Sequence, residues 1–321
     1  MDFIRWGILS TAKIGVEQVI PAMQKGELSK ISAISSRDVD RAIEVADRLG
    51  IEKAYGSYEE LLEDEEIDAI YNPLPNHLHV PMTIKALEAG KHVLCEKPIA
   101  IDLAEAVELA DVVRSFPELK VMEAFMYRFH PQWQVVKQWI DDGEIGAIQT
   151  IHSSFTYYND DPENIRNKED MGGGGLLDIG CYCISASRFL FDDEPIDIKG
   201  EVEIHPDFGV DTLASGVLRF TKGTATFSCS TLASPDQKLI IYGTSGIIEM
   251  DIPFNPQESP ASIRITSGGQ VLKEKTLQAN HYTLQGDAFS KAIIENRDVP
   301  TPIDDAVANM KVVDALLSPD K

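Results

Sequence analysis

Apolar positions in the first third of the chain form short runs, each typical of a buried strand, that alternate with segments of helical periodicity. Gly90 is placed to end one of these helical segments, and Asp102 is placed to cap the next. The alternation predicts a doubly wound parallel sheet, with helices on both faces, over residues 1–122. The expected strands are residues 4–9, 31–34, 67–71, 93–95 and 119–122, and the expected helices are 16–23, 40–49, 80–89 and 102–114.

The pattern changes after about residue 123, where strand-like runs follow one another with turn residues between them. Several runs alternate apolar and polar residues, which is typical of an antiparallel sheet with one solvated or interface-forming face. Residues 123–321 are therefore predicted to form an α+β domain on a large, mainly antiparallel open sheet. The expected strands are 148–157, 198–204, 211–220, 224–231, 238–242, 247–251, 262–266 and 270–277, and the expected helices are 132–141, 176–191, 282–295 and 302–317.

Composition and charge narrow the class of protein. A length of 321 residues is more than one compact core usually organises, so two domains are expected. The 52 acidic residues outnumber the 29 basic ones, and the net charge of −23 argues against nucleic acid or an anionic membrane as a partner. No apolar run has the length of a membrane helix or the form of a signal segment. The four cysteines show neither a framework of pairs nor a metal-ligand spacing, so we expect reduced thiols, a cytoplasmic location and no metal.

A turn of small residues joins the first strand to the first helix, at the place where dinucleotide-binding folds hold a pyrophosphate. In the register Gly-x-Gly-x-x-Gly the chain has Ser10, Ala12 and Gly15, so other small residues replace the first two glycines. A structural turn is the alternative, but the strand-turn-helix context favours a Rossmann-type phosphate site. The residues expected to contact the cofactor there are Ser10, Thr11, Ala12, Lys13 and Ile14.

The second strand ends at Ser36 and Arg37, the position that distinguishes the two nicotinamide dinucleotides. An NAD site usually has an acidic residue here for the ribose hydroxyl, whereas small polar residues and an arginine suit the 2′-phosphate of NADP. We therefore expect NADP. NAD is the alternative, if Arg37 is solvated and Asp38 binds the ribose.

A rigid turn containing Pro73 and Leu74 follows the strand at 67–71. Asn76 and His79 come next, and their side chains are candidates to hydrogen-bond a nicotinamide ribose or the substrate. The alternative for the histidine is a helix cap. We expect this segment to line the cofactor site, because it lies at the carboxyl end of a parallel strand.

Two segments carry residues suited to proton transfer. Lys97 follows the strand at 93–95 directly, where a partly dry crevice readily lowers the pKa of a lysine. Further along, the glycines of 172–175 permit close backbone approach ahead of a helix, and Asp178 and Tyr182 are spaced to share one helix face. A phenol is a poor base at neutral pH, but a nearby ammonium favours the phenolate, so Lys97 and Tyr182 suit the oxidation of an alcohol. An N-cap aspartate with a core tyrosine is the structural alternative.

These segments together resemble the Gfo/Idh/MocA oxidoreductases, which include glucose–fructose oxidoreductase and inositol dehydrogenase. The resemblance rests on the turn at 7–15 and on segments 73–79, 89–98, 123–131 and 173–182, which occur in the family's order. Many members have histidine where Tyr182 stands. In having tyrosine, the chain is similar to the branch of NADP-dependent D-xylose dehydrogenases, dimeric dihydrodiol dehydrogenases and glucose–fructose oxidoreductase.

The resemblance implies roles for individual residues. Lys97 is implied to lie beside the nicotinamide and the reacting hydroxyl, Tyr182 to be the general acid/base, and Asp178 to orient the substrate or support the relay. Glu96 is implied to contact the nicotinamide ribose, and the bond from Lys97 to Pro98 to be cis, as it often is in relatives. Further candidate substrate contacts are Arg128, Tyr158, Asn159 and Arg166. The second domain is implied to bind substrate and to pair through its open sheet face, giving a homodimer or homotetramer.

These features predict an oxidoreductase that transfers a hydride between NADP and a sugar or cyclic polyol hydroxyl, in particular a D-xylose-like aldose 1-dehydrogenase. A trans-1,2-dihydrodiol dehydrogenase with an apolar pocket is a second interpretation. A third is a non-catalytic NADP-sensing regulator, although a sensor has no use for a proton relay. A metal-dependent hydrolase is disfavoured, because the sequence shows no ligand cluster.

Overall fold

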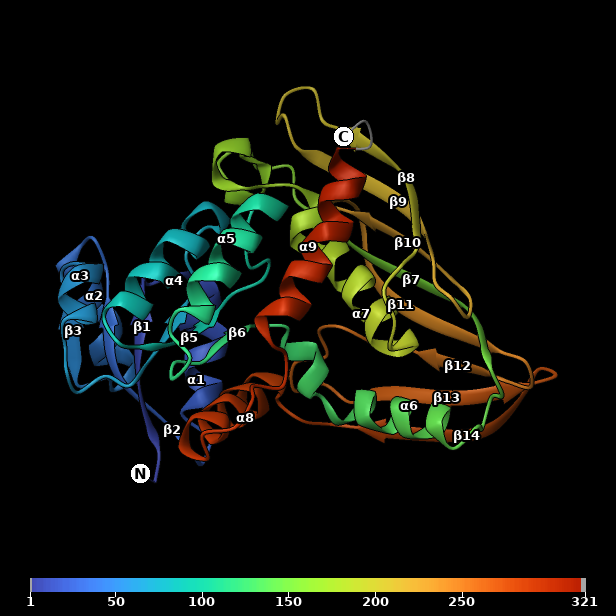
Figure 1. Cartoon of the computed structure of the whole chain (residues 1–321), viewed down its shortest axis with the longest axis horizontal. Coiled ribbons are helices and arrows are strands. Elements are labelled where there is room, and N and C mark those ends of the chain that lie inside the picture. Colours follow the sequence, from blue (N-terminus) through green and yellow to red (C-terminus); the bar gives the residue numbers. More distant parts are fainter. Residues whose placement is uncertain (1, 319–321) are drawn as a thin grey trace. The chain divides into compact units, whose positions relative to one another are not determined.

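The computed structural model describes residues 2–318, which form two compact units (Figure 1). The first unit contains the chain up to Met126 together with Asn280–Val307, and the second contains Tyr127–Ala279 with the chain from Ala308 onwards. The predicted division into 1–122 and 123–321 differs from this one, because α8 (His281–Ile294) packs on the first sheet. The ring of Phe289 in α8 lies 5.6 Å from that of Trp6.

The sheet of the first unit is parallel throughout, with the strand order β3-β2-β1-β4-β5-β6. The interior strands are almost completely buried, as a sheet covered on both faces requires. The predicted doubly wound sheet is therefore confirmed, and its order reverses between β1 and β4, where such folds bind nucleotides. The strands are β1 (Ile4–Leu9), β2 (Ser29–Ser35), β3 (Lys53–Tyr55), β4 (Ala69–Asn72), β5 (His92–Cys95) and β6 (Val121–Glu123).

Short helices connect these strands. Side-chain oxygens of Asp38, Ser57 and Asp102 accept backbone N–H groups at the starts of three of them, α2, α3 and α5. Neither β3 nor α3 was predicted from the sequence, because elements of 3 and 5 residues are too short to show a periodicity. The helices are the π-helix η1 (Gly15–Val19), α1 (Ile20–Met23), α2 (Val39–Leu49), α3 (Tyr58–Leu62), η2 (Asn76–Leu78), α4 (His79–Glu88) and α5 (Leu103–Arg114).

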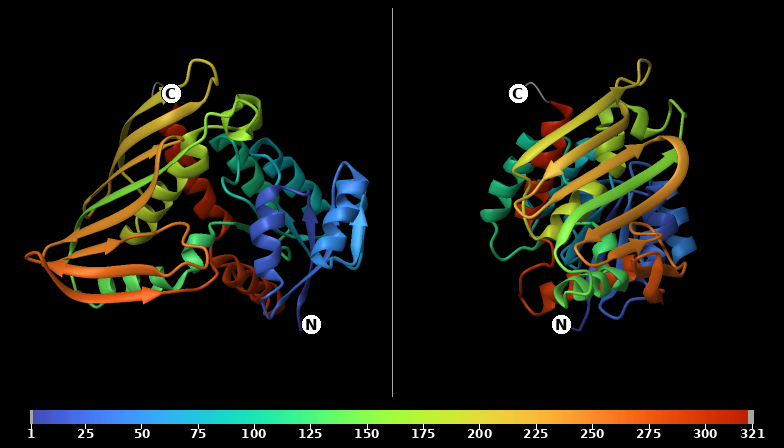
Figure 2. Two further views of the ribbon diagram at one scale, coloured as in Figure 1. Left: turned by 180° about the vertical axis from the view of Figure 1, so that it is seen from behind. Right: turned by 90° about the vertical axis from the view of Figure 1, so that its right-hand side faces the viewer.

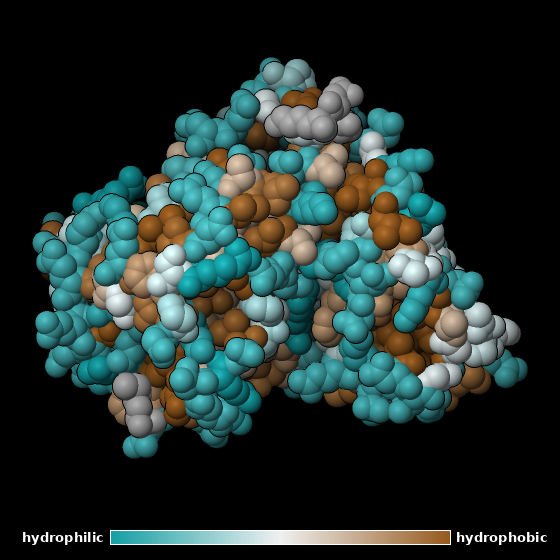
Figure 3. All heavy atoms as spheres, in the orientation of Figure 1, coloured by the Kyte–Doolittle hydropathy of each residue, from teal (hydrophilic) through white to brown (hydrophobic). Residues whose placement is uncertain are grey.

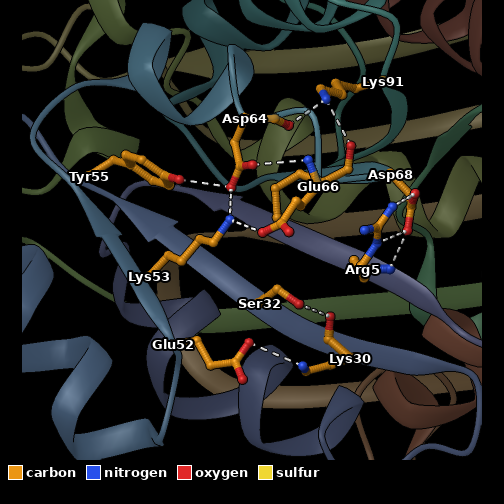
Figure 4. A network of polar contacts seen from close by, with 11 residues as sticks. Arg5, Lys30, Ser32, Glu52, Lys53, Tyr55, Asp64, Glu66, Asp68 and Lys91 are labelled. Atoms are coloured by element: carbon orange, nitrogen blue, oxygen red, sulfur yellow. Dashed lines mark hydrogen bonds and ion pairs between the residues drawn. The ribbon is translucent and has the colours of Figure 1, made fainter.

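A polar network fixes the segment that leads into β4 (Figure 4). Asp64 accepts hydrogen bonds of 2.7 Å from both Lys53 and Tyr55 of β3. Lys91 is buried, and its Nζ donates to the carbonyl oxygens of Asp64 at 2.7 Å and Ile67 at 2.8 Å. Arg5 and Asp68 form a bidentate pair across β1 and β4, shown in the same view. These bonds hold the amino ends of β1 and β4. The predicted nucleotide turn follows the carboxyl end of β1.

The second unit is built on an eight-stranded sheet with the order β14-β13-β12-β11-β7-β10-β9-β8. Strands β7 and β10 pair in parallel, and the other neighbours pair antiparallel, which confirms the predicted sheet. The strands are β7 (Ile148–Tyr158), β8 (Asp197–Ile204), β9 (Asp211–Arg219), β10 (Thr224–Ser230), β11 (Leu232–Gly243), β12 (Ile247–Met250), β13 (Ala261–Ser267) and β14 (Gln270–Leu277).

One face of this sheet carries helices, and the other is open. Helix α7 packs on β7 and β10, and α6 packs on β13. On the open face, visible in the right-hand view of Figure 2, Leu213 and Val217 of β9 are 42% and 46% exposed. The helical segments are η3 (Met126–Phe129), α6 (Pro131–Asp141), η4 (Ile165–Asn167), η5 (Glu169–Met171), the π-helix η6 (Leu176–Gly180), α7 (Cys181–Phe191) and α9 (Ile303–Leu317), which runs across the division between the units.

The surface is mainly polar on the face drawn in Figure 3, where apolar residues form scattered patches. Within residues 2–318, no helix has both the length and the apolar character needed to cross a membrane.

Candidate active site

The predicted phosphate turn lies at the carboxyl end of β1. Ser10 has a φ of 79°, the left-handed conformation that a glycine normally supplies in such turns, and its Oγ accepts the N–H of Ala12 at 3.2 Å. Gly15 opens η1 close to the next strand end, because a Cβ built there lies 3.7 Å from side-chain atoms of Pro73 and Tyr71. Lys13 points outward with its side chain 83% exposed. A π-turn at this position is a recurrent feature of functional sites.

The end of β2 presents a hydroxyl and a guanidinium. Ser36 is buried, and its Oγ accepts the N–H of Asp38 at 3.2 Å. The carboxylate of Asp38 accepts the N–H groups of the first turn of α2, so it acts as a helix cap and is not directed at a ribose. The exposed Arg37 side chain hydrogen-bonds Tyr58, whose pKa is raised by burial and lowered in part by that cation. This arrangement suits a 2′-phosphate better than a 2′-hydroxyl.

His79 links two loops at the carboxyl ends of β4 and β5. Its Nδ1 lies 2.6 Å from the carbonyl oxygen of Pro98, and its Nε2 lies 2.7 Å from that of Leu74. The ring is 1% exposed, and burial lowers its pKa to about 4 although both carbonyls favour the protonated form. The structure therefore gives this histidine a supporting position, whereas the sequence analysis expected a direct contact with ribose or substrate. Asn76 stands at the start of η2, in the same loop as Leu74.

The segment after β5 is held by two carboxylates. Tyr71 donates to Glu96 Oε1 at 2.7 Å, and Glu96 Oε2 accepts the N–H of Lys97 at 3.3 Å. Glu123 Oε1 accepts the N–H of Ile99 at 2.8 Å. The Lys97–Pro98 peptide bond is cis, as the resemblance implied. Burial raises the pKa of Tyr71 well above its usual value, and the charge of Glu96 adds to this, so Tyr71 remains a donor.

In the second unit, the glycine-rich segment is fastened to the start of β9. Asp211 Oδ2 accepts the N–H of Leu176 at 2.7 Å and also hydrogen-bonds the N–H of Gly175. Gly174 has a φ of 120°, and a Cβ there would lie 2.3 Å from Asp211 Oδ1. Gly180 is close-packed, since a Cβ there would lie 2.9 Å from Sγ of Cys229 in β10. The five residues of η6, including Asp178, are thereby fixed on the sheet.

Asp178 is the centre of a polar cluster. Tyr157 of β7 donates to its Oδ2 at 2.6 Å, and Arg166 Nε donates to the same oxygen at 2.9 Å. The charge of Asp178 is the main reason that the pKa of Arg166 is raised, and Tyr157 and Tyr182 contribute in the same direction. Burial, followed by the charge of Asp178, raises the pKa of Tyr157 well above its usual value. Two phenols, a carboxylate and a guanidinium therefore interact within one unit.

The ring of Tyr182 is held by an aromatic cluster. Its centroid lies 5.6 Å from that of Phe155 and 5.7 Å from those of Tyr127 and Phe254. The residue is 4% exposed. Such packing limits the ring to few rotamers, which is what a group that transfers a proton at a fixed position requires.

The structure separates the other candidate substrate contacts. Arg166 joins the cluster, but the 60% exposed Tyr158 donates to Asp160 at 3.1 Å. Arg128 Nη2 donates to Ser185 at 2.8 Å, one turn beyond Tyr182 along α7. Tyr158 was predicted from the sequence as a substrate contact, whereas its neighbour Tyr157 was not. The period-2 alternation of the strand could have identified Tyr157, because it shares the helix-covered face with Phe155 and the buried Ile151.

The first unit fits a dinucleotide. The turns that follow β1, β2, β4 and β5 all lie at the carboxyl edge of one parallel sheet, next to the reversal in strand order. Among the residues that the structure describes, no group of three or more histidine, cysteine, aspartate or glutamate side chains could hold a metal ion. When bound, a nicotinamide cofactor supplies the hydride acceptor or donor, and the chain supplies binding and proton transfer.

Comparison with known proteins agrees with this geometry. A family model described as the oxidoreductase family with an NAD-binding Rossmann fold matches residues 4–123, and the model of the GFO/IDH/MocA C-terminal domain matches residues 133–249. The NADP(+)-dependent D-xylose 1-dehydrogenase 2 of Haloferax volcanii is 37% identical, covering 97% of this chain and 95% of its own. The trans-1,2-dihydrobenzene-1,2-diol dehydrogenase of Xenopus tropicalis is 35% identical, covering 87% and 82%.

A solved structure shows the same fold over the whole chain. The 3-ketoreductase KijD10 of Actinomadura kijaniata, in complex with NADP and TDP-benzene, superposes with a TM-score of 0.90 at 31% identity and covers 99% of this chain and 98% of its own. With both family models matched and relatives above 30% identity along nearly the full length, the chain belongs to the Gfo/Idh/MocA family of oxidoreductases.

Proposed function

We propose that this oxidoreductase is an NADP-dependent aldose 1-dehydrogenase, which oxidises a D-xylose-like sugar at its anomeric hydroxyl. The observation that carries the proposal is the polar cluster in which Asp178 joins Arg166 and Tyr157 beside Tyr182. A hydroxyl substrate needs such a group to take its proton as hydride leaves the carbon. The 37% identity to a D-xylose 1-dehydrogenase over almost the whole chain supports the sugar as substrate.

In this mechanism the chain has three tasks. Ser10, Ala12 and the start of η1 would hold the pyrophosphate of the cofactor, and Arg37 would hold its 2′-phosphate. Tyr182 receives the proton of the substrate hydroxyl, and Lys97 favours its phenolate form. Bound NADP would accept the hydride from the anomeric carbon, and with the proton passed to Tyr182 the product would be a lactone.

A second candidate is a trans-dihydrodiol dehydrogenase. The observation in its favour is the aromatic cluster of Tyr127, Phe155 and Phe254 around Tyr182, since flat apolar side chains suit a cyclic diene diol. The 35% identity to a dihydrodiol dehydrogenase supports the same candidate. The proton chemistry is unchanged, and the two candidates differ only in the ring that is bound.

Turnover with a substrate panel tests the proposal. The purified protein is mixed with aldoses, polyols and trans-dihydrodiols, each with NADP or NAD, and the reduced cofactor is followed by absorbance. We expect the highest kcat/KM with a pentose and NADP, and a loss of about 100-fold or more in Lys97→Ala and Tyr182→Phe with NADP still bound. Turnover of dihydrodiols alone selects the second candidate. Binding of NADP without turnover of any panel member identifies a sensing regulator and refutes both.

Assembly and location are part of the same proposal. We infer a homodimer or homotetramer formed through the open face of the second sheet, where Leu213 and Val217 are exposed in alternation with buried residues. Four free cysteines, all buried, fit a reducing compartment, and we propose a cytoplasmic location.

A further inference from the structure

Two tyrosines contact or adjoin Asp178, and their surroundings differ. Tyr157 donates its phenolic hydrogen to Asp178 Oδ2 at 2.6 Å. Tyr182 lies four residues after Asp178, beyond the junction of η6 with α7, and both tyrosines interact electrostatically with Arg166. A phenol that donates to a carboxylate keeps its proton, whereas a nearby cation favours the phenolate. Like groups in different environments are a usual sign of divided acid/base roles.

We propose that the two phenols have separate tasks: Tyr182 exchanges the proton with the substrate, and Tyr157 is a positioning residue that acts through Asp178. This inference rests on the proposed oxidoreductase function and extends it to a residue that the sequence analysis did not select. Tyr157 and Arg166 bind the same oxygen of Asp178 from two different segments, β7 and η4. Two donors that converge on one oxygen fix the plane of the carboxylate more tightly than either donor does alone.

The charged and titratable groups around Tyr157 support this assignment. They are Asp178 on η6, Arg166 on η4 and the buried thiol of Cys229 on β10. Burial and Asp178 raise the pKa of Tyr157 well above its usual value, and Arg166 opposes them only in part. We therefore expect Tyr157 to remain a hydrogen-bond donor to Asp178 and not to act as the base.

The first test requires neither substrate nor cofactor. Tyrosinate absorbance is followed during alkaline titration of the wild type, Tyr157→Phe and Tyr182→Phe. Because the pKa of Tyr157 is raised well above its usual value, we expect Tyr157→Phe to leave every phenol that ionises in the accessible alkaline range in place. If Tyr157→Phe removes a phenol that ionises in that range, or one that ionises before the phenol removed by Tyr182→Phe, the inference is refuted. A failure of the whole enzymatic proposal leaves this test intact, so the two outcomes are distinguishable.

The second test is a double-mutant cycle with an active substrate. Tyr157→Phe should lower kcat roughly 10- to 100-fold with little change in KM, because a carboxylate displaced by a fraction of an ångström misplaces the reacting groups. In an Asp178→Asn background the same substitution should have almost no further effect, since Tyr157 acts through that carboxylate. Losses of kcat that multiply in the double variant would contradict action through Asp178.

Two comparison variants separate positioning from general damage to the fold. Tyr242→Phe removes a hydroxyl from β11, where the ring contacts His152 on the open face, and it should retain wild-type kcat. Tyr158→Phe alters the adjacent exposed ring, and its effect should be smaller than that of Tyr157→Phe. A larger loss in Tyr158→Phe would show that the tyrosine beside Asp160, and not the one beside Asp178, serves the site. Thermal unfolding of all variants confirms that each remains folded.

Discussion

The carboxyl group of Asp211 should make the second unit less stable as the pH rises. The residue is 3% exposed, and burial raises its pKa from 3.8 to about 6 despite hydrogen bonds from the N–H groups of Leu176 and Gly175. A raised pKa means that the folded chain binds the proton more tightly than the unfolded chain. The stabilisation from this group is therefore complete below a pH of about 3.8, and it is lost as the pH rises to about 6 and above.

The magnitude follows from the two pKa values. Each pKa unit corresponds to about 1.4 kcal/mol, so the change from 3.8 to about 6 amounts to about 3 kcal/mol of unfolding free energy. An asparagine at position 211 does not titrate, and whatever its packing costs is the same at every pH. The difference in unfolding free energy between wild type and Asp211→Asn should thus decrease by about 3 kcal/mol across this window.

Urea unfolding at a series of pH values measures that difference. The chain has three tryptophans, and a Trp6→Phe background leaves Trp133 and Trp139, which are both buried in the second unit, as fluorescent reporters. The exposed Asp207, on the connection that leads from β8 to β9, provides the control substitution Asp207→Asn. A difference between wild type and Asp211→Asn that stays constant, or that grows as the pH rises, refutes the assignment of a raised pKa to Asp211.

Two further predictions concern the cofactor and the backbone. Arg37→Ala should weaken NADP binding roughly 10- to 100-fold with little effect on NAD binding, as measured by fluorescence titration. Tyr58→Phe should also weaken NADP binding, but less strongly. Equal losses of affinity for the two cofactors would place the 2′-phosphate elsewhere. Gly174→Ala should lower the unfolding free energy by about 2–6 kcal/mol, because the strain of a left-handed φ and the overlap of the new Cβ with Asp211 add together. Gly268 is the control, because it has a φ of 57° and open space around it. Gly268→Ala should therefore lower the unfolding free energy, measured by chemical denaturation, by only about 1–2 kcal/mol. Equal losses of stability in the two variants would show that the overlap with Asp211 has no effect.

Local patterns were sufficient to predict a parallel first sheet, apart from its short edge strand β3. Strand-helix alternation indicated that the strands are parallel, and small residues after β1 indicated the turn in which Ser10 adopts a left-handed φ. Such patterns could not predict on which sheet α8 packs. Apolar spacing shows that a helix buries one face, but it does not show which sheet receives that face, and here Trp6 and Ser290 make the contact.

The supporting role of His79 was also hidden from the sequence. A histidine beside a predicted cofactor loop suggested a direct contact, but the carbonyl groups of Leu74 and Pro98 occupy both ring nitrogens. Pro98 follows a different strand, so the contact depends on the pairing of β4 with β5. Asp38 differs, because its capping role has a local signature: an aspartate directly before a helical segment.

Only part of the cluster around Asp178 could be predicted from the sequence. Glycine spacing and the interval between Asp178 and Tyr182 are local features, whereas Tyr157 is positioned by strand register. Cys229 of β10 pairs with Phe155 of β7 on one side and with Ala214 of β9 on the other. Because η6 packs on Cys229, this register places the helix-facing residues of β7 and the first residue of β9 beneath η6.

A slip of one residue in β7 would exchange Tyr157 for Tyr158 at Asp178, because neighbouring strand residues face opposite sides of the sheet. The choice between these two tyrosines is therefore made by the register of the parallel pair of β7 with β10 and not by either residue's own chemistry. The same register directs the hydroxyl of Tyr157 to the helix-covered face, next to Phe155, and leaves Tyr158 in solvent. In this unit, the geometry of the proposed proton relay depends on strand pairing as much as on the residues assigned to it.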